Sequence, residues 1–252
     1  RFSNRIHPLF TDQQRSWCFE CGAEGFRDGT KCTKCGTTHI ADFSHVVHVE
    51  PQPLWPCVYV LDPHPRKPHM MAWFQITPND DVQQVAELCV AGGAEDVRDE
   101  VARVEADYGF HQITRLIDPN MGRSPSSARN RETTWQDEFR SVGLTCDLAN
   151  DSDVGRSRLN AYLKPDPGTG EPRFISDVSC TKTHQQLKRY VWDEHRRSRE
   201  KEPRQTPKES NDDFPTIIKY LMNSNPEFHA LKHLAQVYTR MTANVRKGPL
   251  GY

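Results

Sequence analysis

Two apolar runs separated by a proline-rich turn dominate the pattern of the chain and predict a β-hairpin. Residues 58–61 form a β-branched and apolar run typical of a strand, and Asp62 ends it. Prolines at three of the residues 63–68 exclude a helix, and a second apolar run follows over residues 69–76. A carboxylate at the inner end of a strand is costly unless it is paired, hydrogen-bonded or bound to a cation. Asp62 is therefore either a turn cap or part of a polar site.

Strand-type and helix-type patterns alternate through the rest of the chain, which indicates an α/β fold. Val97, Val101 and Val104 recur at helical spacing, so residues 94–108 are expected to form a helix. Further strands are expected at 5–10, 44–49, 81–90, 112–117, 144–148 and 173–175. Further helices are expected at 132–142, 154–163, 183–193 and 226–245, together with one that opens at residues 210–213. Residues 121–131 and 195–208 are expected to be loops.

The composition fits one large domain, or one domain plus a small module. The 252 residues are 35% hydrophobic and 27% charged. A net charge of −1 gives no overall attraction to nucleic acid, so such binding must come from local basic patches. No membrane-spanning run or signal peptide is present in this sequence. A chain that starts at Arg1 is expected to be a fragment or a processed product.

Four of the eight cysteines have the spacing of a metal site. Two C-x-x-C pairs, each followed by glycine, are formed by Cys18, Cys21, Cys32 and Cys35. Four thiolates from two such turns favour a structural zinc ion over two disulfides or a redox pair. A module this small lacks a sufficient core, so the metal would supply its folding energy. The other cysteines are scattered, which suggests reduced thiols and a reducing compartment.

Acidic residues recur where predicted elements begin or end. Asp62 and Asp118 end strands, and Asp212 and Asp213 open a late helix. If the two strands are parallel neighbours, Asp62 and Asp118 lie side by side and should hold a divalent cation. Oxygen ligands select Mg²⁺ or Mn²⁺, and two such ions can activate water for phosphodiester hydrolysis. Helix capping alone would also explain Asp212 and Asp213.

These motifs in this order resemble the RNase H-like nuclease domain of viral large terminase subunits, the DNA-packaging motors of tailed phages. The resemblance rests on YVLDPHP with Asp62, RLIDPNMG with Asp118 and NDDFPTIIKYL with Asp212 and Asp213. The segment GEPRFISDVSCTKTHQQLKRYVW is similar to the strand and helix before the family's last acidic helix. Thr216 departs from the family, which often has a further acid there. No Gly-Lys dipeptide is present, so the phosphate loop of the packaging ATPase must lie outside this sequence.

The resemblance implies an RNase H-like mixed β-sheet flanked by helices over residues 48–225. A zinc ribbon at about residues 16–40 would be inserted within residues 1–47, and residues 226–252 would form a C-terminal helix and tail. The implied activity is a metal-dependent endonuclease that cuts concatemeric viral DNA during genome packaging in the host cytoplasm. Asp62 would bridge two Mg²⁺ or Mn²⁺ ions, Asp118 and Asp213 would each hold one, and Asp212 would assist. The implied partners are double-stranded DNA, a packaging ATPase domain, the portal and the small terminase subunit.

Basic side chains near the acids are the candidate DNA contacts. They are Arg66 and Lys67 in the hairpin turn, Arg123, Arg129 and Arg131 beside Asp118, and Arg196 and Arg197 in a charged stretch. A solvated protein surface would explain the same charges. Whether Lys31 and Lys34 let the zinc module bind DNA or protein also stays open.

Two further hypotheses compete with the terminase nuclease. One is another RNase H-like enzyme, a resolvase or transposase, and the other is a non-catalytic zinc-ribbon adaptor whose acids are only caps. Replacement of Asp213 by Asn is expected to abolish cleavage if this residue holds metal. Stability is then expected to hold or rise, because repulsion between the acids is relieved.

Overall fold

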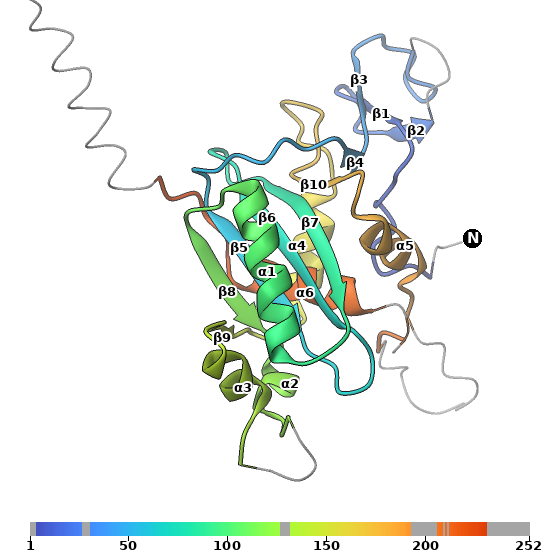
Figure 1. Cartoon of the computed structure of the whole chain (residues 1–252). Helices are drawn as coiled ribbons and strands as arrows, with labels where there is room; N and C mark the ends of the chain where they lie inside the picture. The colour runs from blue at the N-terminus through green and yellow to red at the C-terminus, as the bar shows by residue number, and fades with distance from the viewer. Residues whose placement is uncertain are drawn as a thin grey trace, which may run out of the picture.

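A seven-stranded mixed sheet of order β4-β10-β7-β6-β5-β8-β9 forms the centre of the molecule (Figure 1). The computed structural model describes residues 4–26, 31–126, 132–192, 206–208, 210 and 212–230. The strands are β4 (Val46–Val47), β5 (Cys57–Asp62), β6 (His69–Ile76), β7 (Val82–Val90), β8 (Ile113–Ile117), β9 (Asp147–Leu148) and β10 (Phe174–Asp177). Strand β6 runs antiparallel to both β5 and β7, whereas the remaining pairs are parallel.

Helices cover both faces of this sheet. Helix α1 (Ala94–Tyr108) crosses one face, as Figure 1 shows. The opposite face carries α4 (Val154–Tyr162), α5 (Thr181–Arg189) and α6 (Asp213–Asn223). Two short helices, α2 (Pro119–Arg123) and α3 (Trp135–Ser141), follow β8. None of the described helices has both the length and the apolar character that a membrane span requires.

The alternation of side chains along β5 divides the core into two clusters. Tyr59 and Leu61 pack in the cluster that includes α1, whereas Val58 and Val60 pack in the cluster that includes α6. All four are at most 7% exposed, so both faces of this strand are buried. By the same period of two, the next residue on the α6 face is Asp62. The Asp62 carboxylate therefore lies between the sheet and α6, in line with the apolar side chains of Val58 and Val60.

A three-stranded antiparallel sheet of order β2-β1-β3 forms a separate small module near the N-terminus. Its strands are β1 (Arg15–Cys18), β2 (Glu24–Phe26) and β3 (Ile40–Phe43). The module packs against the turn at residues 165–172. Gly170 in that turn has a φ of 75°, and a Cβ there would lie 2.6 Å from Cβ of Ala41. A side chain at this position would therefore separate the module from the core.

Most predicted elements are confirmed within four residues at their ends, but several differ or are much shorter. Residues 5–10 are not a strand, because Pro8 lies in a turn that the Phe10 N–H closes on the His7 carbonyl at 3.3 Å. Residues 121–123 of the predicted loop belong to a helix that starts at Pro119, since proline suits the first helical position and Asp118 caps the helix. The predicted strands at 44–49 and 144–148 are reduced to two residues each, Val46–Val47 and Asp147–Leu148. Of the predicted last helix, residues 226–230 are not helical and the rest lies outside the described residues.

Candidate metal centre

Strands β5 and β8 bring Asp62 and Asp118 to the same edge of the large sheet. The strands pair in parallel with Leu61 opposite Ile117, and the N–H of Asp118 donates to the Leu61 carbonyl over 2.9 Å. The predicted parallel neighbourhood of these two strands is therefore confirmed. Helix α6 covers the face onto which Asp62 projects, and it contributes residues from its first turn onward.

Asp62 is a buried carboxylate that needs a counter-charge. It is 6% exposed, and its Oδ2 lies 3.3 Å from Nε2 of His64. Burial raises the pKa of Asp62, and the charges of Asp118 and Asp213 add to this rise, whereas the His64 contact opposes it. Among the described residues no backbone N–H donates to the Asp62 carboxylate, so it does not act as a turn cap.

Asp213 begins α6 and approaches Asp62 through a shared histidine. Oδ1 of Asp213 lies 3.1 Å from His64 Nε2 and 3.2 Å from Lys67 Nζ. Gln186 of α5 donates to the other oxygen, Oδ2, over 2.9 Å. The His64 contact is the largest of the effects that hold the pKa of Asp213 well below its usual range. In return, Asp213 and then Asp62 raise the pKa of His64 to about 9, so that the imidazole carries a positive charge at neutral pH.

The arrangement of these side chains fits a divalent cation. One ligand atom from each of Asp62, His64 and Asp213 lies within 4.8 Å of the other two. The Nε2 atom of His64 is buried and makes no hydrogen bond to the described residues. Carboxylate oxygens that converge in this way are the ligands that Mg²⁺ and Mn²⁺ bind in proteins.

Asp118 is held by hydrogen bonds on both of its oxygens. Oδ1 accepts from the N–H groups of Asn120 at 2.7 Å and Met121 at 2.6 Å, so Asp118 is the cap of α2. Oδ2 accepts a short hydrogen bond from the hydroxyl of Tyr220 on α6. A carboxylate oxygen has two lone pairs, which leaves one on Oδ2 for a cation. Capping and metal binding are therefore compatible at this residue.

The side chain of Lys219 packs against the ring of Tyr220. Its side chain is buried, it pairs with Asp151, and its Nζ lies 4.8 Å from the centre of the Tyr220 ring. Asp151 also accepts from the side-chain amide of Asn120 over 3.1 Å. This chain of contacts joins α6 to α2 around Asp118. The position of the Asp118 carboxylate is thereby tied to the docking of α6.

Asp212 occupies the N-cap position of α6, but its side chain makes no capping hydrogen bond. The preceding residue, Asn211, lies outside the described residues. Helix α6 thus begins at Asp213, with Asp212 before it. Asp213 is the one of these two acids that lies beside Asp62 and His64. An assisting role of Asp212 stays a prediction.

The predicted DNA contacts lie on two exposed segments of the described chain. Arg66 and Lys67 are exposed in the β5–β6 turn, and Arg123 is exposed at the end of α2. Lys67 touches Asp213, and α2 is capped by Asp118, so both segments border the acidic site. The other candidates, Arg129, Arg131, Arg196 and Arg197, lie outside the described residues.

The cysteine cluster has the dimensions of a tetrahedral zinc site. Sγ of Cys18 lies 3.6 Å from that of Cys35, and Sγ of Cys21 lies 3.7 Å from that of Cys32. Bonds of about 2.3 Å to a tetrahedral zinc ion place sulfur atoms about 3.8 Å apart. The N–H of Lys34 donates to Sγ of Cys32 over 3.4 Å, a contact that favours the thiolate that zinc requires.

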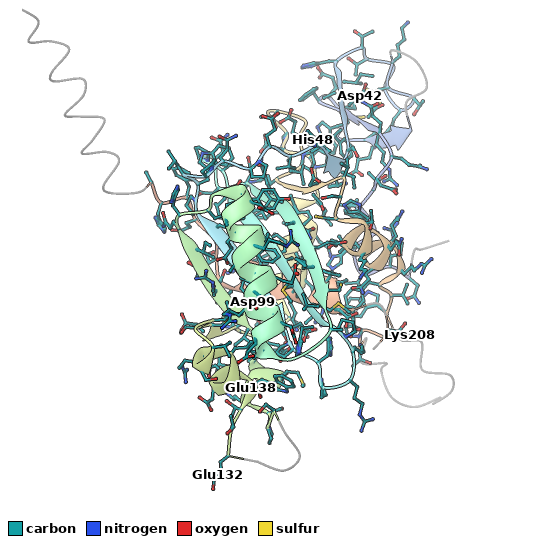
Figure 2. All side chains as sticks on the ribbon, in the orientation of Figure 1. Asp42, His48, Asp99, Glu132, Glu138 and Lys208 are labelled. Atoms are coloured by element: carbon teal, nitrogen blue, oxygen red, sulfur yellow. The ribbon has the colours of Figure 1, made fainter. Side chains whose placement is uncertain are left out.

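The cysteine cluster lies away from the acidic site. In Figure 2, Asp42 on β3 of the small module and Glu138 on α3 mark opposite ends of the molecule. Helix α3 contacts α2, the helix that Asp118 caps. A metal ion at the cysteines would therefore stabilise the module without touching the chemistry at the acids.

Three residues of the acidic site were not singled out from the sequence: His64, Tyr220 and Lys219. His64 has a local signal, because it stands two residues after Asp62 in a turn stiffened by prolines on both sides. Tyr220 follows Asp213 by seven residues, which places it two helical turns along the same face of α6. That Tyr220 points at Asp118 depends on how α6 packs on β8, which no local pattern reports.

Comparison with known proteins identifies the fold. No protein-family model matches the sequence, and no curated protein matches it. Among solved structures, the large terminase of a thermophilic bacteriophage superposes with a TM-score of 0.55 at 19% identity, over 71% of this chain and 42% of that chain. The P22 large terminase nuclease domain superposes with a TM-score of 0.56 at 12% identity, over 75% of this chain and 91% of that chain. This chain therefore spans less than half of the thermophilic phage's protein and has the RNase H-like fold of phage large terminase nuclease domains.

Proposed function

We propose that this chain is the nuclease domain of a phage large terminase and cuts concatemeric viral DNA during genome packaging. The observation that carries the proposal is the convergence of Asp62 and Asp213, with Asp118 at the end of the strand beside Asp62. Asp118 lies close enough for its charge to act on Asp62, and the three acids stand where β5 and β8 end and α6 begins, on a fold like that of the P22 nuclease domain. A buried acid such as Asp62 is costly unless it is paired, hydrogen-bonded or bound to a cation, and several perturbed acids in one place are typical of a functional site.

Asp62, Asp118 and Asp213 would hold two Mg²⁺ or Mn²⁺ ions. Asp62 would be shared by both ions, with Asp118 on one ion, Asp213 on the other and Asp212 assisting. When bound, such ions lower the pKa of a water molecule and neutralise the charge that develops on the phosphodiester. Tyr220 fixes the Asp118 carboxylate through its hydroxyl donor. Burial excludes water from Asp62, which strengthens its attraction for the cations.

The basic residues beside the acids would position the DNA backbone. Arg66, Lys67 and Arg123 are exposed on segments that border the site, where phosphate contacts would place a scissile bond near the carboxylates. Such contacts are independent of base sequence and sensitive to salt.

The proposed assembly requires parts outside this sequence. The large terminase of the thermophilic bacteriophage has also been solved in complex with ADP, and this chain matches 42% of it. We accordingly propose that a packaging ATPase domain accompanies this nuclease and that the portal and the small terminase subunit are its partners in the host cytoplasm. Residues 48–225 would form the nuclease domain. A zinc ribbon at about 16–40 would lie within residues 1–47, and residues 226–252 would form a tail.

Plasmid nicking tests this function directly. Zinc-replete protein should nick supercoiled plasmid in Mg²⁺ or Mn²⁺ and should be inactive in EDTA. Asp62→Asn should abolish nicking, whereas Asp99→Asn should not, because Asp99 is an exposed acid on α1 (Figure 2). Equal nicking by Asp62→Asn and the unmodified protein would exclude the proposed site. Absence of any bound divalent ion would favour a non-catalytic zinc-ribbon adaptor.

A further inference from the structure

The acidic site contains a nitrogen atom placed as a metal ligand would be. His64 Nε2 lies 3.3 Å from Asp62 Oδ2 and 3.1 Å from Asp213 Oδ1. Two ligand atoms bound at about 2.1 Å to one ion, at right angles to each other, lie about 3.0 Å apart. His64 Nε2 is thus spaced from each carboxylate oxygen like the neighbouring corner of one coordination shell, and all three atoms lie within 4.8 Å of one another.

The position of the His64 ring is fixed by its surroundings. Pro63 and Pro65 restrict the backbone on both sides. The N–H of His64 donates to Nδ1 of His69 over 3.1 Å. With Nδ1 an acceptor, His69 carries its proton on Nε2, which lies 3.2 Å from the Gly92 carbonyl.

His69 is itself anchored in the core. Its ring meets those of Trp135 and Phe139 edge to face, at centroid distances of 5.1 and 5.6 Å. The backbone that carries His64 is therefore connected to packed side chains of β6 and α3. Its imidazole is held against the carboxylates and does not lie loosely on the surface.

We propose that His64 is a nitrogen ligand of the divalent ion held by Asp62 and Asp213, and that this ion site prefers Mn²⁺ to Mg²⁺. The inference rests on the proposed function and names the ligand set and metal class of one of its two ions. Mn²⁺ binds carboxylates as Mg²⁺ does, but it is a first-row transition metal and also accepts imidazole, although it is the weakest binder of that series, whereas Mg²⁺ is a hard ion that demands oxygen ligands. A site with two carboxylates and one imidazole is consequently less suited to Mg²⁺ than a site of carboxylates alone.

The alternative is that His64 only balances the acids as a cation and leaves when a metal binds. The two roles predict opposite effects of removing the ring. Loss of a ligand weakens Mn²⁺ binding, whereas loss of a competing positive charge strengthens it. A binding experiment therefore separates them without any measurement of cleavage.

The test measures Mn²⁺ binding to the zinc-replete chain by electron paramagnetic resonance. Unmodified protein should show nitrogen modulation of the Mn²⁺ signal and bind Mn²⁺ more tightly than Mg²⁺. His64→Ala should lose the modulation and bind Mn²⁺ on the order of tenfold more weakly, with a smaller change for Mg²⁺. His64→Gln, which keeps a polar side chain, serves if the alanine variant does not fold. His48→Ala is the matched control, because His48 is 76% exposed and contacts Asp177 instead.

Two failures are distinguishable in this experiment. If Mn²⁺ binds and Asp62→Asn abolishes binding, but His64→Ala binds as tightly or more tightly, His64 is not a ligand and the proposed nuclease stands. If the unmodified protein binds no Mn²⁺, or if Asp62→Asn binds it normally, the proposed metal centre fails and the His64 ligand fails with it.

Discussion

Replacement of Asp213 by Asn is the most informative single change, because it separates the charge of the residue from its size. Asp213 accepts from Gln186 on one oxygen and faces His64 and Lys67 with the other. An Asn can satisfy only one of these sides. If its oxygen faces Gln186, its amide donor faces two positively charged groups. If the Asn amide is turned the other way, its N–H₂ group faces the N–H₂ group of Gln186. Gln186 cannot turn in response, because its Oε1 accepts from the Phe214 N–H at 2.7 Å.

The structure therefore reverses the expectation that an Asn at this position preserves or raises stability. Repulsion from Asp62 is outweighed by His64, Gln186 and Lys67, as the lowered pKa of Asp213 indicates. Loss of charged hydrogen-bond partners of this kind costs about 1–3 kcal/mol in unfolding free energy. In a chain of this size, each kcal/mol corresponds to a fall in Tm of about 2–4 °C.

The loss of stability at alkaline pH is a second quantity that can be worked out from the structure. The pKa of His64 is raised to about 9 in the folded protein from an unfolded value of about 6.5. The folded state thus binds the proton more tightly, so this stabilisation is complete below about pH 6.5 and is lost as the pH rises to about 9. Because the ring is partly exposed, we discount the full linkage to about 1–2 kcal/mol. Asp213→Asn should reduce this alkaline decrease, because Asp213 is the largest cause of the raised pKa of His64, and Asp62 should sustain the remainder.

The assay is thermal melting of the zinc-replete protein, without added Mg²⁺ or Mn²⁺, across this pH range, with plasmid nicking in Mn²⁺ measured on the same preparations. Asp99→Asn is the control for a carboxylate outside the site. If Asp213→Asn melts like the unmodified protein and keeps its alkaline decrease, the ion pair with His64 does not exist in solution. Near-normal nicking by a folded, zinc-replete variant would move the ligand role to Asp212.

Three further predictions address the supports of the site. Tyr220→Phe removes the donor to Asp118, so stability should fall by about 1 kcal/mol and nicking should slow; unchanged values in both assays would contradict a positioning role. Cys18→Ser should lose zinc and loosen the small module while the main melting transition persists; metal analysis with melting checks this, and loss of the whole transition would show that the two parts fold together. Burial lowers the pKa of His7 and His45 to about 4, so the free energy of unfolding should decrease as the pH falls from about 6.5 to 4. A Tm that stays constant over that pH range would refute this prediction.

Local sequence determined the elements and the cysteine cluster. The runs before Asp62 and Asp118 are rich in β-branched and apolar residues, as strands are, and both segments are strands in the structure. The two C-x-x-C turns place their sulfurs by backbone geometry alone, because each pair is separated by only two residues. Such patterns are readable because their causes act within a few residues of chain.

Only the tertiary structure decided how the acids are partnered. The contact between Tyr220 and Asp118 joins residues 102 positions apart, and the contact between Lys67 and Asp213 joins residues 146 positions apart. The start of α6 also depends on its docking, since burial of its apolar face fixes which acid reaches His64. Periodicity fixes the face on which a side chain lies, but the partner across that face is set by packing between distant segments.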